Sequence, residues 1–265
     1  MLYSRLKSME ININCDLGEK SKFHSIKNDP ELLSIVNSAN VACGYHAGDE
    51  KTMEMVIKIS KKNGVSIGAH PSFNDPDNFG RKRMKLSSLE IRKLIIDQYE
   101  IIQNIAQKNN ENVTHIKPHG ALNNMACEDS ELSILLANVI NEIDKDIIYL
   151  VPTGSKMEIA AKRLNMKIAC EIFADRNYED DGNLVSRIKP NALITDPKIS
   201  QKHVLSMVKN QSINCLSGKQ IPCDIDSVCI HGDNMNSLST AKSIKINLLD
   251  NGLKLEALNK MKKFL

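Results

Sequence analysis

The chain has 265 residues, of which 42% are hydrophobic and 25% charged, a composition typical of globular proteins and a length that suits one α/β barrel. The formal net charge is +3, aromatic residues make up 4%, and no basic stripe with interleaved aromatics is present, so nucleic-acid binding is not expected. No apolar run approaches the ~18 residues of a membrane-spanning helix, and no apolar leader follows Met1, so a membrane association is not expected either.

In chain order, short apolar runs that read as strands alternate with segments of helical period. The strand-like runs are residues 10–15, 36–42, 64–70, 113–118, 146–152, 167–173 and 227–233. The helix-like segments are residues 87–109, 129–143, 154–165, 197–210 and 236–252. Ser87, with Glu90 three residues later, predicts a capping box at the start of the first of these helices. Residues 20–33 show no clear helix, and residues 211–226 read as an irregular segment or a hairpin.

This alternation predicts a parallel sheet covered by helices, because the strands are apolar and rich in β-branched residues. About seven strand–helix units favour a closed barrel over an open doubly wound sheet. The phosphate-binding patterns G-x-G-x-x-G and G-x-x-x-x-G-K-[ST] do not occur, which argues against a Rossmann or P-loop fold. We therefore expect residues 1–265 to form one α/β domain, a TIM-like (β/α) barrel of about seven parallel strands with surrounding helices.

The seven cysteines predict a reducing compartment. No pair has the C-x-x-C spacing of a zinc ribbon or a redox dithiol, and seven is an odd number. Most cysteines lie in apolar stretches such as "SVCI" and "KIAC", and we interpret them as small buried hydrophobic residues. Cys15 and Cys43 lie at strand positions that we expect to be buried, which indicates a packing role rather than a nucleophilic one. Together with the missing leader, this usage predicts a cytoplasmic protein.

Ionisable residues follow the predicted strands at equivalent points, and the carboxyl ends of barrel strands form the functional face of such a fold. A single histidine at a strand end is more often structural than catalytic, but the barrel brings these ends together, so we interpret them as one site. The candidate residues are Asp16, His46, His70, Lys117, His119, Asp175, Arg176, Arg187, His231 and Asp233. Asp16 is expected to begin the loop after the first strand, and His115 is expected to be structural.

Two kinds of chemistry fit the first three candidates. Asp16, His46 and His70 can bind a divalent metal through one carboxylate and two imidazoles. They can equally form a proton-transfer network in which the carboxylate orients an imidazole. Spacing alone leaves both interpretations open.

Cationic residues lie beside these candidates. Lys117, just before a Pro-His pair, can neutralise an anion or polarise a carbonyl. The segment "RNYEDDGNLVSR", residues 176–187, has an arginine at each end and a turn signal at Asp-Gly. We interpret it either as a lid over the site or as a solvated hairpin.

Six motifs occur in fixed order between about residues 10 and 249: "NCDLGE", "SANVACGYHAGD", "GAHPSFNDPDNFGRKRM", "IKPHGAL", "EIFADRNYEDDGNLVSR" and "CIHGD". Together they resemble the LamB/YcsF family. The resemblance implies a barrel of the glycoside hydrolase/deacetylase type. It also implies hydrolysis of 5-oxo-L-proline to L-glutamate coupled to hydrolysis of ATP, with Mg²⁺, in a complex with subunits B and C. In related deacetylases an Asp-His-His set binds a metal, and by this resemblance the set falls on Asp16, His46 and His70.

The implied reaction needs a general base for water, cations for anionic groups and carboxylates that orient them or hold Mg²⁺. The candidate bases are His46, His70, His119 and His231. The candidate cations are Lys117, Arg176 and Arg187, and the candidate carboxylates are Asp16, Asp175 and Asp233. Three positions depart from the family pattern: the loop "KSKFHS" after the first motif, Asn123 where tyrosine is usual, and Asn191 where glycine is usual.

Two other functions remain open from the sequence. One is a stand-alone metal-dependent amide or deacetylase-type hydrolase that needs no ATP, which the missing phosphate-binding loop favours. The other is a non-catalytic protein that binds the substrate for its partners. The number of ionisable residues at strand ends argues against this second function.

Overall fold

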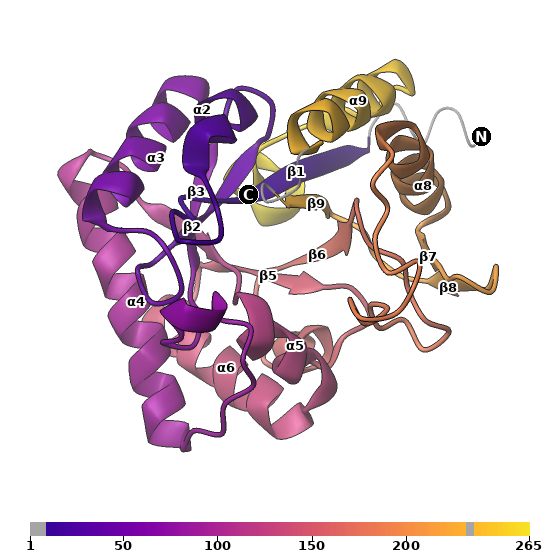
Figure 1. Ribbon diagram of the computed structural model, residues 1–265. Coiled ribbons are helices and arrows are strands. Elements are labelled where there is room, and N and C mark those ends of the chain that lie inside the picture. The colour runs from indigo at the N-terminus through magenta and orange to yellow at the C-terminus, as the bar shows by residue number, and fades with distance from the viewer. Residues whose placement is uncertain (1–8, 232–235) are drawn as a thin grey trace.

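Seven parallel strands close into a barrel in the computed structural model, which describes residues 9–231 and 236–265 (Figure 1). The strands are β1 (Glu10–Leu17), β2 (Ser38–Ala42), β3 (Ser66–His70), β4 (Val113–Ile116), β5 (Ile148–Pro152), β6 (Ile168–Phe173) and β9 (Ser227–His231). They pair in this order, and β9 pairs again with β1, so the sheet closes on itself. This confirms the predicted TIM-like barrel, and each predicted strand is present.

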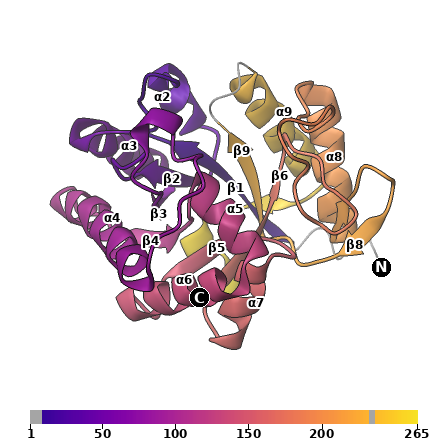
Figure 2. The same cartoon turned by 60° about the horizontal axis from the view of Figure 1, so that its bottom comes forward.

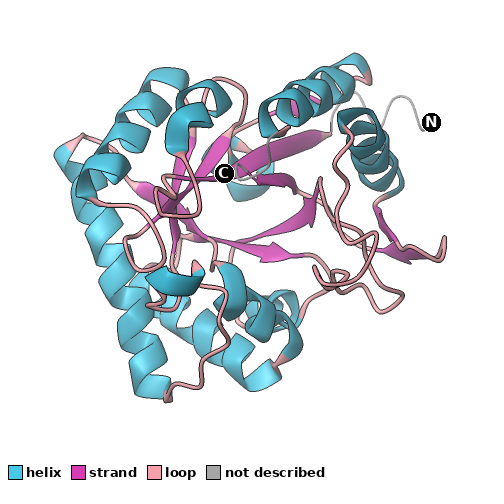
Figure 3. Ribbon diagram, viewed as in Figure 1, coloured by secondary structure: helices cyan, strands magenta, loops and turns pink. Residues whose placement is uncertain are grey.

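Helices surround the barrel, as Figures 2 and 3 show. They are α2 (Asp29–Leu32), α3 (Glu50–Asn63), α4 (Ser88–Lys108), α5 (Gly120–Glu128), α6 (Ser130–Ile143), α7 (Lys156–Arg163), α8 (Pro197–Asn210) and α9 (Ser237–Asp250). The predicted capping box of α4 forms: Ser87 N donates to Glu90 Oε2 at 2.7 Å, and Glu90 N donates to Ser87 Oγ at 3.3 Å. No helix in the described ranges is both long and apolar enough to cross a membrane.

Helices α2, α3 and α5 are additions to the helices expected from periodicity, and α2 falls within residues 20–33, where the sequence shows no clear helix. Helix α3 begins at an N-cap, Asp49, whose Oδ1 accepts a hydrogen bond from Thr52 N at 2.8 Å. Asp49 therefore caps a helix, although its place after a strand also suits a site residue. Helix α5 has only nine residues and follows directly on the Pro-His-Gly motif, so it offers little periodic signal.

Short elements complete the fold. Strands β7 (Ser212–Asn214) and β8 (Gln220–Pro222) pair antiparallel, which confirms the hairpin interpretation of residues 211–226. Strand β10 (Lys254–Leu255) pairs with the first residues of β1. The 3-10 turns are η1 (Ile26–Asn28), η2 (Pro76–Asn78), η3 (Leu258–Lys260) and η4 (Lys262–Phe264).

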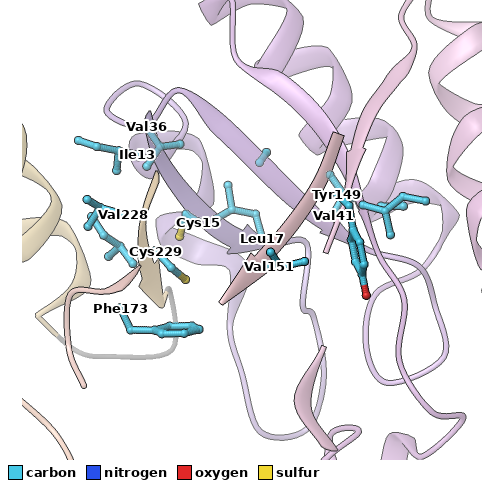
Figure 4. Close-up of a cluster of buried hydrophobic side chains, with 14 of the residues drawn as sticks. Ile13, Cys15, Leu17, Val36, Val41, Tyr149, Val151, Phe173, Val228 and Cys229 are labelled. Carbon is cyan, nitrogen blue, oxygen red and sulfur yellow. The ribbon is translucent and has the colours of Figure 1, made fainter. Parts of the chain in front are cut away.

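The two faces of the barrel strands differ in polarity. On β1, Ile11, Ile13, Cys15 and Leu17 are fully buried in the core between the barrel and its helices. Figure 4 shows three of these side chains among the other buried hydrophobic residues. Burial of each large aliphatic side chain contributes about 1.5–3 kcal/mol. All seven cysteines are free, and Cys15 and Cys43 are buried, as expected.

The inner face of the barrel carries polar side chains that pair with one another. Asn12 Nδ2 donates to Ser38 Oγ at 2.8 Å, and Ser227 Oγ donates to Asn12 Oδ1 at 2.7 Å. One level higher, His115 Nε2 lies 3.0 Å from Asn40 Oδ1. Burial lowers the pKa of His115 to about 3, so this ring is neutral and structural, as expected. These pairs satisfy buried polar groups beneath the carboxyl end of the barrel.

A glycine makes room for the His115 ring. A Cβ atom on Gly68 of β3 would lie 2.2 Å from His115 Nε2, closer than any real contact. The neighbouring strands therefore fit around the ring only because this position has no side chain.

The expectation that Asp16 begins a loop is wrong. Strand β1 extends to Leu17, and its pairing continues through Asp16, which lies opposite Asn40 of β2 and His231 of β9. The alternation of the strand continues too, so Asp16 points to the same inner face as Asn12 and Asn14. A strand position holds this carboxylate more rigidly than a loop position does.

Candidate active site

A cavity of about 420 Å³ opens at the carboxyl ends of the barrel strands. The predicted residues that line it are Asp16, His70, Lys117, His119, Arg176, Arg187 and His231. His46 and Asp175 lie behind this lining, each in contact with a residue that forms it. Asp233 lies outside the described residues. The carboxyl ends of strands far apart in the sequence thus contribute to one cavity.

The two oxygens of Asp16 have different partners. Oδ1 accepts hydrogen bonds from Asn40 Nδ2 at 2.8 Å and from Lys117 Nζ at 2.9 Å. Oδ2 lies 3.4 Å from His70 Nε2. Burial by itself raises the pKa of Asp16, but the charges of His70 and Lys117 outweigh it and hold the pKa well below its usual range. Asp16 is therefore an ionised carboxylate.

Backbone carbonyls fix the tautomers of two histidines. His70 Nδ1 lies 2.7 Å from Lys117 O, and His119 Nε2 lies 3.0 Å from Phe79 O. A carbonyl oxygen only accepts, so each of these nitrogens carries the proton. The opposite nitrogens, His70 Nε2 and His119 Nδ1, face each other at 3.0 Å. In neutral rings both present lone pairs, which repel unless a proton or a cation lies between them.

Glu19 joins three imidazoles. Its Oε1 lies 3.2 Å from His46 Nε2, 3.2 Å from His119 Nδ1 and 3.9 Å from His70 Nε2. The His46 and His119 rings stack with centroids 3.9 Å apart. Burial lowers the pKa of both rings, so they are neutral. Glu19 is thus a site residue that the strand-end pattern, which ends at Asp16, does not select.

Glu19 is positioned beside the histidines because the loop after β1 packs against the loop after β2. Gly18, with φ +73°, turns the chain after β1, and its N–H donates to Asp29 Oδ2 at 2.8 Å. A Cβ atom on Gly48 would lie 2.7 Å from Gly18 O, so the loops after β1 and β2 touch through a residue without a side chain. The glycines around the His46 turn therefore bring His46 against Glu19.

A strained residue covers the histidines. Phe79 has φ +55°, a conformation rare for a bulky residue that costs about 1–3 kcal/mol. Its carbonyl accepts the His119 proton, and its ring meets the rings of His46 and His119 edge-on at 5.5 and 5.3 Å. Such strain persists where the surroundings require the conformation, and here the required element is the carbonyl that orients His119.

These residues fit a divalent cation, although not the predicted set. Among the described residues, ligand atoms within 4.8 Å of one another occur in three groups: Asp16 with His70 and His119, Glu19 with His46 and His119, and Asp16 with Cys229 and His231. The predicted set of Asp16, His46 and His70 is not among them. His46 follows β2 in a turn and stacks behind His119, so it reaches Glu19 instead of Asp16. Two imidazoles with tautomers fixed by carbonyls, beside two carboxylates, are typical metal ligands.

A second histidine–carboxylate pair lies next to Asp16, on β9 and on the loop after β6. His231 Nδ1 lies 2.8 and 2.9 Å from the two carboxylate oxygens of Asp175. The His231 ring stacks on Phe173 with centroids 5.6 Å apart. Burial raises the pKa of Asp175, but the contact with His231 outweighs it and lowers the pKa below its usual value. An ionised Asp175 thus orients His231, as in a base–orienter pair.

Lys117 is part of the barrel interior. It is 2% exposed, and its Nζ lies 2.9 Å from Asp16 Oδ1, 3.3 Å from Glu171 Oε2 and 3.1 Å from Cys229 Sγ. Its charge therefore neutralises the carboxylates of Asp16 and Glu171, and an additional contact with a bound anion or carbonyl stays a prediction. Glu171 is fully buried, and burial raises its pKa. The inward position of a glutamate within the apolar run "KIACEIF" is the signal that could have identified it.

The two arginines of the predicted lid differ. Arg176 is 7% exposed and donates from Nη2 to Val185 O at 2.6 Å and from Nε to Ala192 O at 3.4 Å. Arg187 is exposed and lines the cavity. An antiparallel bridge joins Tyr178 and Leu184, so the segment forms a hairpin. Tyr178, Leu184 and Arg187 line the cavity, so this hairpin lies along the site and is not simply solvated. Its movement as a lid stays a prediction.

The departure at residue 191 keeps the turn geometry. Asn191 has φ +61°, the left-handed conformation that glycine adopts most readily. Asparagine is among the few other residues that tolerate it. The turn that follows the hairpin is therefore compatible with asparagine in place of glycine.

Comparison with known proteins gives one consistent result. The model of the LamB/YcsF family matches residues 11–263. The chain is 39% identical over 252 residues to the A subunit of 5-oxoprolinase from Clostridium beijerinckii, covering 95% of this chain and 99% of that protein. It is 41% identical over 239 residues to the protein of the same name from Campylobacter jejuni subsp. doylei, covering 90% and 94%.

Solved structures agree. The crystal structure of a lactam utilization protein from Thermus thermophilus superposes with a TM-score of 0.87 at 30% identity, covering 94% of this chain and 100% of that one. The catalytic domain of a peptidoglycan N-acetylglucosamine deacetylase from Eubacterium rectale has a TM-score of 0.51 at 12% identity, covering 96% and 89%. This second likeness concerns the fold alone.

Proposed function

The chain belongs to the LamB/YcsF family, and from this premise we propose that it acts as the A subunit of a 5-oxoprolinase, which opens the lactam ring of 5-oxo-L-proline to give L-glutamate. We further propose that ring opening is coupled to hydrolysis of ATP to ADP and phosphate, with Mg²⁺, in a complex with subunits B and C. The names of the relatives support a role as one component of a larger enzyme.

One observation carries the chemical part of the proposal: two different histidine–carboxylate arrangements meet at one cavity. Asp16 lies with His70 and His119, and Glu19 lies with His46 and His119. The His231–Asp175 pair adjoins them, because His231 is also grouped with Asp16. Hydrolysis of an amide needs stabilisation of a developing oxyanion and a group that transfers protons. The two arrangements match these two needs.

We assign the first arrangement to a divalent cation, held by Asp16, Glu19, His70 and His119. The protonated His70 Nδ1 and His119 Nε2 support this assignment, because they direct the other ring nitrogens toward the carboxylates. When bound, such a cation polarises a carbonyl or phosphoryl oxygen. Lys117 and Asn40 keep the Asp16 carboxylate in place through Oδ1.

We assign proton transfer to His231. Its Nδ1 is held by Asp175, so Nε2 is the atom that takes a proton from the attacking water. The ionised Asp175 stabilises the imidazolium that results. As the C–N bond of the ring breaks, the nitrogen must gain a proton, and the protonated His231 returns it there. Of the three cations considered, Arg187 is the one we assign to an anionic group of the substrate, because the donors of Arg176 are turned to backbone carbonyls.

Dependence on ATP and on the partners tests the proposal. The purified chain alone is expected to cleave little or no 5-oxoproline, and glutamate should appear once subunits B and C are added with MgATP. Amino-acid analysis measures the product. Robust turnover by the isolated chain without ATP would overturn the proposal in favour of a stand-alone hydrolase. Full activity of the complex after His231→Ala would instead indicate a protein that only binds substrate.

We also retain the prediction of a cytoplasmic location. The seven free cysteines support it, because unpaired thiols are typical of reducing compartments.

A further inference from the structure

One polar side chain of the cavity has no role in the contacts described so far. Asn123 of α5 lines the cavity and is 6% exposed. Its buried Oδ1 accepts no hydrogen bond from any residue that the structure describes. A buried amide oxygen without a partner is costly. In this structure the oxygen has almost no accessible surface, so the amide must turn toward the cavity before a ligand N–H can reach it. The position of Asn123 therefore points to contact with bound substrate.

Helix α5 places this amide close to the reactive groups. His119, Asn123 and Cys127 are spaced four residues apart, and all three line the cavity. The backbone N–H of Asn123 donates to His119 O at 3.3 Å, so the two residues are one helical turn apart, about 5.4 Å along the axis. A group held by Asn123 thus lies beside His119, whose Nδ1 faces His70 and Glu19.

The chemistry of a lactam matches a carboxamide. A five-membered ring forces its amide into the cis form, so the N–H and the C=O point to the same edge. Open-chain amides are almost always trans and present these groups on opposite sides. The Asn123 amide carries an acceptor, Oδ1, next to a donor, Nδ2. It can therefore accept from the lactam N–H and donate to the lactam C=O in one plane, whereas a trans amide can make only one of these bonds.

We propose that Asn123 recognises the cis-amide edge of the bound lactam and selects cyclic over open-chain amides. This inference rests on the proposed function. Binding through Asn123 holds the amide carbon near the histidine cluster.

The test combines changes in the protein and in the ligand. Inhibition of 5-oxoproline cleavage by 2-pyrrolidinone, which has the N–H, is compared with inhibition by N-methyl-2-pyrrolidinone, which lacks it. The complex with subunits B and C is used throughout. The wild-type complex should prefer 2-pyrrolidinone by roughly tenfold, the effect of one hydrogen bond. Asn123→Leu, of similar volume, should lose this preference and raise KM for 5-oxoproline about tenfold to 100-fold.

Two further variants complete the design. Asn123→Asp keeps the acceptor and loses the donor, so it should keep the preference for the N–H ligand while binding both ligands more weakly. Asn104→Leu, on the exposed face of α4, is the control and should behave like wild type. Thermal denaturation checks that each variant folds.

The outcomes separate the inference from the function it rests on. An unchanged preference in Asn123→Leu, with 5-oxoproline still cleaved, overturns the role of Asn123 and leaves the proposed function intact. Absence of 5-oxoproline cleavage by the wild-type complex overturns the proposed function itself.

Discussion

The two histidine–carboxylate arrangements of the cavity use the same residue types in different ways. Near β1 to β4, His70 Nδ1 and His119 Nε2 donate hydrogen bonds to backbone carbonyls. Their other ring nitrogens point toward Glu19. On the β6–β9 side, His231 and Asp175 form a one-to-one pair. The partner of the second ring nitrogen therefore decides the role of each histidine. A carbonyl partner fixes the proton on one nitrogen and leaves the lone pair of the other for a cation. A carboxylate partner stabilises the charged ring that forms during proton transfer.

The largest effect is expected for Asp16→Asn. The substitution removes the charge that both a cation and His70 require, so activity of the reconstituted complex should fall by several orders of magnitude. Bound divalent metal, measured by mass spectrometry of the purified chain, should fall with it. Circular dichroism should show an unchanged fold, because asparagine keeps the shape of the side chain.

The same substitution at Asp49 serves as its control. Asp49 caps α3, and asparagine is an equally good N-cap, so Asp49→Asn should leave activity and metal content unchanged. Turnover of Asp16→Asn close to that of wild type would show that Asp16 is merely structural.

Asp175→Asn should disable the β6–β9 side alone. Asparagine does not stabilise an imidazolium, so kcat should fall by about 10²–10⁴, the usual worth of general acid–base catalysis. Metal content should stay at the wild-type level, because Asp175 is not among the described groups that could hold an ion. Loss of metal from this variant would contradict the separation of the two sides.

His46→Phe should produce a smaller change on the β1–β4 side. Phenylalanine can keep the stack on His119 but loses the contact of His46 Nε2 with Glu19. Removal of such a support typically lowers metal affinity about 10- to 100-fold, which a competition titration with a chelator measures. His24→Phe, in the loop after β1, is the matched control. If His46 were itself a ligand in the predicted set, the loss would be as complete as that of Asp16→Asn.

The smallest effect concerns Asp29, which holds the turn before Glu19. Burial raises the pKa of Asp29 to about 7, well above its usual value in an unfolded chain. The folded state therefore favours the protonated form, and its contribution to stability is complete below the unfolded pKa and declines as the pH rises to about 7. Asparagine cannot ionise but still accepts from Gly18 N.

The measurement is the difference in melting temperature between Asp29→Asn and wild type. It should shift in favour of the variant as the pH rises from about 5 to about 8, by an amount that reflects one titrating group. A difference independent of pH would indicate that Asp29 does not titrate in this range.

Much of the fold can be predicted because it depends on local pattern. All seven barrel strands follow from short apolar runs, and α4 follows from its period and its Ser87–Glu90 cap. Helix α5 escapes prediction because nine residues after a proline motif give little periodicity. The predicted strand, residues 10–15, ends two residues before β1 does, because Asp16 is polar and faces an interior that is polar as well.

The sequence predicts many of the residues that gather at the site but not which atoms of these residues contact one another. Strand ends identify His70, His119 and His231, but the ligand grouping depends on which backbone carbonyl each ring meets, and no spacing shows this. Glu19 lies beyond the strand in sequence, and only the turn at Gly18 brings it back toward the histidines. Glu171 shows its role only through its inward position on β6 and its contact with Lys117.

The closure of the barrel also has a consequence for protein synthesis. Strand β1 emerges early from the ribosome, yet Asn12 pairs with Ser227, which lies 215 residues later. At about 5–20 residues per second, roughly 10–40 s pass before that partner exists. Throughout this time Asp16 lacks its neighbour on β9, and the apolar outer face of β1 has only the earlier half of the molecule to pack against. The cavity is therefore among the last parts of the molecule to form, and a pause in translation between β6 and β9 would prolong the exposure of β1.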